Sequence, residues 1–94
     1  MMQSDVLSAH TNTSASLVSG RFRLKHVTFN SNGTAGTLVL YDNASAASGR
    51  ILWQFDFGAN VVAIPVLFPG EGILANNGIY ATLTNANSCT ICYG

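Results

Sequence analysis

Apolar and polar residues alternate most clearly in "RILWQFDF", residues 50–57. One side of this segment would carry Ile51, Trp53, Phe55 and Phe57, and the other Arg50, Leu52, Gln54 and Asp56. A period of two residues is typical of a β-strand with one buried face. We therefore predict a strand here, with Trp53 in the core rather than serving as a stacking platform for a sugar or a base.

The chain from residue 20 onward contains further short apolar segments that are separated by turns. Candidate strands are "RFRLKHVTF", "TLVLYD", "VVAIPVLF", "ILA", "GIYATL" and "CTICYG". The run at 61–68 is consistent with a strand buried on both sides, and Pro65 places it at a sheet edge or a bulge, because proline lacks an N–H group. About eight short strands, without helical periodicity, predict an all-β fold. An antiparallel β-sandwich of jelly-roll-like form fits this strand count best.

The segment "RFRLKHVTF", residues 21–29, has a less regular pattern. In a regular strand, the apolar residues of its first and second halves would lie on opposite faces. A β-bulge near Lys25 or His26 would restore one apolar face, because an additional residue reverses the alternation. That face would comprise Phe22, Leu24, Val27 and Phe29. We therefore predict a bulged strand.

The same segment holds three of the four basic residues, Arg21, Arg23 and Lys25, in one row. The row is a solvated face or a protected sheet edge, since edge strands often carry Lys and Arg, or it is a contact with an acidic protein surface. The sequence leaves both interpretations open. Nucleic acid is a weaker third partner, because four acidic residues cancel the basic charge.

Residues 1–19 are rich in Ser, Thr and Asn and show neither helical periodicity nor clean alternation. We interpret them as an extended N-terminal arm, followed by a β-sandwich domain over residues 20–94. The apolar residues that a partner could hold are Val6, Leu7, Leu17 and Val18. Partial strand addition to a neighbouring subunit would be the mode of contact.

The composition favours a subunit of an assembly. The 94 residues suffice for one domain with a small core. The formal net charge is zero, and charged residues make up 9% of the chain, against roughly 25% in an average soluble protein. Such a surface is poorly protected against association. No apolar run is long enough to span a membrane, and no signal peptide is recognisable, so we expect synthesis in the cytoplasm.

Candidate chemistry is sparse. Cys89 and Cys92 are three residues apart in a strand-like segment, so their side chains should point to opposite faces and form neither a metal site nor a disulfide. The carboxylates and histidines are scattered without a catalytic motif, and Glu71 reads as a turn residue between glycines. We therefore expect no enzyme activity, metal, cofactor or small-molecule substrate.

Two longer stretches resemble known proteins. They are "GTAGTLVLYDNASAASGRILWQFDF" and "PGEGILANNGIYATLTNANSCTICYG". Their "GTLxLxD" strand, Gly and Ser loop, alternating strand, "PGxGILxxNGIY" motif and terminal "YG" resemble small single-domain β-sandwich virion proteins of tailed phages. The resemblance covers about residues 20–94, and its matched positions are turn glycines, a proline and core apolar residues.

This resemblance implies a virion structural protein of the capsid decoration or cement type. Such a protein would lie on the capsid surface as a homo-oligomer, bound to the major capsid protein or to other virion subunits. The alternative is a tail or fibre component that binds a carbohydrate or a receptor, since jelly rolls also host lectins. Tyr41, beside Asp42 and Asn43, is the candidate sugar contact.

Overall fold

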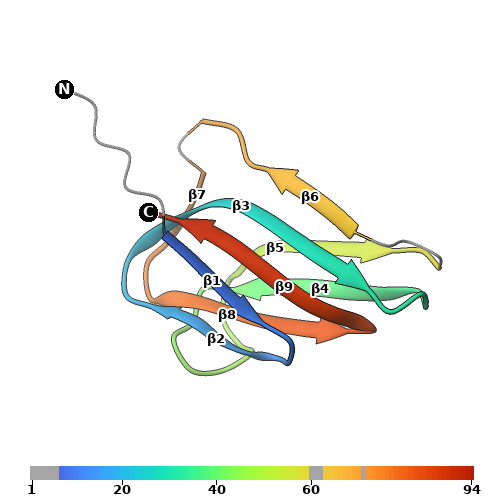
Figure 1. Ribbon diagram of the computed structural model, residues 1–94. Helices are drawn as coiled ribbons and strands as arrows, with labels where there is room; N and C mark the ends of the chain where they lie inside the picture. The colour runs from blue at the N-terminus through green and yellow to red at the C-terminus, as the bar shows by residue number, and fades with distance from the viewer. Residues whose placement is uncertain (1–6, 60–62, 71) are drawn as a thin grey trace.

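The computed structural model describes residues 7–59, 63–70 and 72–94, and these residues form nine strands and no helix (Figure 1). The strands are β1 (Leu7–Thr11), β2 (Ala15–Ser19), β3 (Phe22–Ser31), β4 (Gly36–Tyr41), β5 (Ile51–Phe57), β6 (Ala63–Leu67), β7 (Ile73–Ala75), β8 (Gly78–Thr84) and β9 (Ala86–Tyr93). The all-β prediction is confirmed.

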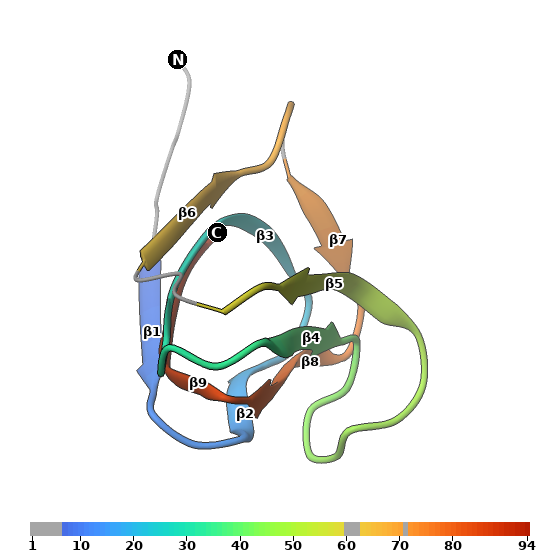
Figure 2. The same ribbon diagram turned by 90° about the vertical axis from the view of Figure 1, so that its right-hand side faces the viewer.

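The strands form two antiparallel sheets packed face to face (Figures 1 and 2). The larger sheet has the order β1-β9-β3-β6, with β7 also paired to β3, and the smaller sheet has the order β2-β8-β4-β5. The first strand therefore pairs with the last, and the second pairs with β8. Apart from the short β7, this strand order is that of a jelly roll, which consists of two Greek keys.

The first nineteen residues differ from the arm that we expected. Within their described part, β1 pairs with β9 and β2 pairs with β8, so each adds an edge strand to one of the two sheets. The sandwich therefore begins at Leu7 rather than at residue 20. The pattern was hard to recognise because these edge strands bury few large side chains.

The bulge predicted in β3 is confirmed. The register between β3 and β9 shifts between Leu24 and His26, which makes Lys25 the additional residue. Leu24, Val27 and Phe29 are consequently all buried on the inner face. They meet residues of the opposite sheet in one core, whose largest fully buried side chains are Phe29, Leu24, Leu38, Leu40, Ile79, Ile91, Val27 and Cys89.

Trp53 packs against this core from β5. Its ring stacks on Phe55, with the ring centroids 5.7 Å apart, and it meets Phe68 edge to face. These are core contacts, as predicted for Trp53. The predicted faces are wrong at the start of β5, where Ile51 is exposed and Leu52 is buried, because the register with β4 shifts there.

The strand around Pro65 is an edge strand, as the proline indicated, but it is not buried on both sides. Among the described strands β6 pairs only with β3, and the alternate side chains on its outer face are exposed. Ala63, Pro65 and Leu67 are exposed, and Leu67 retains 78% of its accessible surface. An apolar composition therefore misled the prediction at an edge.

The turn between β6 and β7 contains two glycines with positive φ, Gly70 (64°) and Gly72 (87°). This agrees with the interpretation of "PGEG" as a glycine-dependent turn. Glu71 itself lies outside the described residues.

Candidate functional site

The outer face of the larger sheet brings together small polar side chains from three strands. In the registers of β1, β9 and β3, His10 lies opposite Thr90, and Thr90 lies opposite Thr28. His10 Nδ1 and Thr90 Oγ1 are hydrogen-bonded at 2.8 Å, and Thr28 Oγ1 and His26 Nδ1 share a longer contact of 3.4 Å. We call this region the neutral face.

The neighbouring rows extend the neutral face in both directions. Cys92 lies opposite His26, and Ser88 lies opposite Asn30, whose amide donates to the Ser88 hydroxyl at 3.2 Å. Cross-strand side chains in such pairs lie about 5 Å apart. The hydroxyl, amide and imidazole groups are thus held in place by neighbours on the rigid sheet.

An apolar border flanks the neutral face along β6. Leu67 is the cross-strand neighbour of His26, Pro65 that of Thr28, and Ala63 that of Asn30. These three side chains are exposed. The central rows of this face therefore carry neutral polar groups beside exposed apolar ones.

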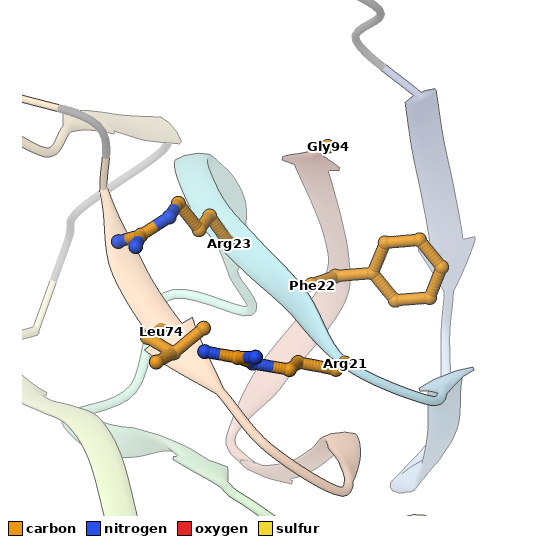
Figure 3. A pocket seen from close by; sticks show the side chains of 5 residues that line it. All are labelled: Arg21, Phe22, Arg23, Leu74 and Gly94. Atoms are coloured by element: carbon orange, nitrogen blue, oxygen red, sulfur yellow. The ribbon is translucent and has the colours of Figure 1, made fainter.

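The basic residues lie at one end of the same sheet. Arg21 precedes β3 and is exposed, whereas Arg23 is half-buried and pairs with Leu74 of β7. Figure 3 shows both guanidinium groups on the same side of the ribbon, toward β7. With Phe22, Leu74 and Gly94 they line an open pocket of about 300 Å³. Lys25 does not line this pocket; it is the half-buried additional residue of the bulge and lies between Leu24 and His26 on the same strand.

The apolar residues expected to bind a partner have separate positions. Val6 lies outside the described residues. Leu7 is 49% exposed at the start of β1, and Leu17 is partly buried against the core. Val18 is only 6% exposed, because β2 places it opposite Ile79. Val18 therefore belongs to the chain's own core rather than to a surface that a partner can reach.

Asp42 connects the loop after β4 to the turn between β7 and β8, close to the basic end of the larger sheet, because its neighbour Arg50 donates to the Leu74 carbonyl. Its carboxylate accepts hydrogen bonds from the backbone N–H groups of Asn76 (3.0 Å) and Asn77 (2.8 Å), and Arg50 Nε lies 3.9 Å away. Burial alone would raise the pKa of this carboxyl group. The hydrogen bonds and the nearby guanidinium outweigh burial and lower the pKa below its ordinary value of 3.8.

The side chain of Asn43 is also engaged within its loop. Its carbonyl oxygen accepts from the N–H groups of Ser45 and Ala46, and its amide donates to Ser48. Tyr41, the candidate sugar contact, is half-exposed, but the polar groups of its neighbours Asp42 and Asn43 are engaged in these loops.

The two thiols occupy opposite faces of β9, as predicted. Cys89 is fully buried in the core, and its burial raises the pKa of the thiol to about 12. Cys92 is half-exposed on the neutral face, and both cysteines are free thiols. A Cys89 thiolate is therefore scarce at neutral pH, and Cys92 is the accessible sulfur.

The described ranges lack two other kinds of site. Residues 7–59, 63–70 and 72–94 contain no group of three or more His, Cys, Asp or Glu side chains placed to hold a metal ion. They also contain no helix long and apolar enough to cross a membrane.

Sequence reasoning missed the neutral face because it depends on pairing between distant segments. Nothing local to His10 indicates that it lies beside Thr90. The available signal was a run of small polar residues at alternate positions of the last strand, at Ser88, Thr90 and Cys92.

In comparisons with known proteins, no family model, no curated protein and no solved structure matches this chain.

Proposed function

We propose that this chain is a structural subunit that binds other protein subunits through the neutral face. The observation that carries the proposal is the composition of that face. Its central rows hold neutral, mutually bonded side chains, with exposed apolar residues along β6 and basic residues at one end. Depletion of charged residues at the centre of a surface patch is the compositional mark of protein interfaces.

The phage-like pattern of turns and strands gives the proposal a more specific form. We infer a capsid decoration or cement subunit on the surface of a virion, with the major capsid protein as its partner. The near-absence of net charge supports this assignment, because a subunit held in an assembly needs less charge for solubility than a free monomer does. No catalytic step is part of the proposal.

The carbohydrate-binding alternative has less support at its candidate residues. A sugar site usually combines an aromatic ring with free carboxylate or amide groups. Here Asp42 is 7% exposed and bonded to two backbone N–H groups, and Asn43 is bonded within its own loop. Tyr41 therefore lacks the polar neighbours that the sequence suggested.

A charge placed at the centre of the neutral face tests the proposal. Thr28→Lys should weaken binding to shells assembled from the major capsid protein of the same genome by about tenfold or more, because an unpaired charge would be buried on binding. Co-sedimentation of the purified protein with these shells, over a range of protein concentrations, gives the affinity.

Gln54→Lys is the matched control. Gln54 is exposed on β5 of the opposite sheet, so the same added charge should leave binding within about twofold of the wild type. Circular dichroism and thermal unfolding verify that both variants are folded. The assignment of the binding face is refuted if both variants bind as tightly as the wild type. The assignment as a capsid subunit is refuted if the folded wild type does not bind shells.

A further inference from the structure

The open edge of β1 has a regular backbone that can pair with another strand. Arg23 and Gly94 exchange two backbone hydrogen bonds, both 3.0 Å long. The preceding residue, Tyr93 at the end of β9, must then direct its N–H and C=O groups away from β3 and toward β1, because these directions alternate along an antiparallel ladder.

The same alternation settles the directions of the backbone groups in β1. Leu7, Ala9 and Thr11, which lie opposite Tyr93, Ile91 and Cys89, direct their N–H and C=O groups toward β9. The backbone groups of Ser8 and His10 therefore point away from the sheet. β1 is the last strand of its sheet on this side, and both residues are exposed.

The other sheet edges are less suited to pairing, and β7 is only three residues long. Phe68 donates its backbone N–H to Lys25, so along β6 the position of Pro65 faces the open edge, where proline offers no donor. The registers of β2 and β5 are each interrupted by a shift. β1 pairs with β9 over its whole length without one. Edges are commonly blunted by proline, charge or bulges, and β1 has none of these.

We propose that two copies of this chain pair antiparallel through β1 and so join their larger sheets into one. A two-fold axis at Ala9 places Ser8 opposite His10 of the second copy. Each copy then donates two backbone hydrogen bonds, from Ser8 and His10, and accepts two at the carbonyl groups of the same residues. The groups at this edge are therefore self-complementary.

The side chains of β1 are compatible with this pairing. The segment "LSAHT" contains neither Lys, Arg, Asp nor Glu, so no like charges meet across the axis. Leu7, which is 49% exposed in the single chain, comes to lie opposite Thr11 of the second copy, and the pairing covers part of its surface. The inference does not rest on the proposed function, because it uses backbone groups at the edge of β1, where His10 is the residue shared with the neutral face.

Ser8→Pro tests the pairing with the full-length protein. The backbone N–H group of Ser8 points to the open edge. Proline at this position therefore removes a donor to the second copy, while the backbone bonds of Leu7 and Ala9 to β9 remain. We expect the wild type to convert from monomer to dimer between about 1 μM and about 1 mM in sedimentation equilibrium. Ser8→Pro should stay monomeric over that range, and the control Ser8→Ala, which keeps the N–H group, should dimerise like the wild type.

Amide hydrogen exchange of the wild type gives a second test that needs no variant. The amides of Ser8 and His10 should be protected at high protein concentration and exchange rapidly at low concentration, whereas those of Leu7, Ala9 and Thr11 should be protected at both. A wild type that remains monomeric at about 1 mM, or a folded Ser8→Pro that dimerises normally, overturns the proposal. So does protection of Ser8 and His10 that is independent of concentration.

Discussion

At the scale of single residues, Asp42 links the loop after β4 to the turn before β8 through hydrogen bonds to Asn76 and Asn77. The carboxylate is enclosed, yet its charged form is favoured by N–H donors and by Arg50. Because the pKa is lower in the folded chain than in the unfolded chain, Asp42 contributes stability above the unfolded value near 3.8. That contribution is lost as the pH falls through the lower, folded pKa.

We predict that Asp42→Asn lowers the free energy of unfolding at pH 7 by about 1–3 kcal/mol, because buried donors lose a charged acceptor. The difference from the wild type should shrink as the pH falls below about 4. Urea unfolding between pH 2.5 and 7 measures both quantities. Asp56→Asn is the control, since Asp56 is exposed and bonded to Thr37. A difference between wild type and Asp42→Asn that stays constant over this pH range would contradict the linkage.

At the scale of the elements, the turn between β6 and β7 is fitted to the bulge of β3. A Cβ atom on Gly72 would lie 2.2 Å from the carbonyl oxygen of Leu24 and 3.3 Å from Cα of Lys25. The turn can approach the bulge this closely only because residue 72 has no side chain. Its positive φ adds a second reason for glycine at this position.

Gly72→Ala should therefore destabilise the fold by about 2–4 kcal/mol, since both the clash with backbone and the left-handed conformation oppose it. Gly70→Ala is the matched control from the same turn. Gly70 also has a positive φ, but nothing lies within 4 Å of its Cβ position, so about 1 kcal/mol is expected. Chemical denaturation compares the two variants. Equal losses of stability would show that the contact with Leu24 is unimportant.

The sequence predicted those elements whose pattern is local. The alternation of β5 from Trp53 onward, the slip that marks the bulge at Lys25 and the turn glycines are all contained within short windows. β1 and β2 were missed because their polar and small residues hide the alternation. The neutral face was missed for another reason. The positions of His10 and Thr90 relative to each other depend on a register between segments 80 residues apart.

At the scale of the whole molecule, the first strands are part of both sheets rather than an appendage. From the sequence, deletion of residues 1–19 should leave a folded sandwich that fails to assemble. The structure changes this expectation, because the deletion removes β1 and β2 and with them the core residue Val18.

We now predict that deletion of residues 1–19 lowers the free energy of unfolding by about 3 kcal/mol or more, since β8 and β9 lose a neighbour and core surface becomes exposed. Deletion of residues 1–6 is the control, because it leaves both strands in place. Thermal unfolding followed by circular dichroism measures the effect. If the variant that lacks residues 1–19 unfolds cooperatively at the temperature of the wild type, the expectation that residues 20–94 form the sandwich alone would be restored.

The pairing of β1 with β9 also determines when this protein can fold during its synthesis. β9 lies between β1 and β3, and it is made after every other strand. Until β9 has emerged from the ribosome, β1 has no partner in the larger sheet and β3 lacks one of its neighbours. Contacts between such distant segments form slowly. The nascent chain therefore presents unpaired strands until β9 has been made, and exposed strand edges of this kind favour aggregation.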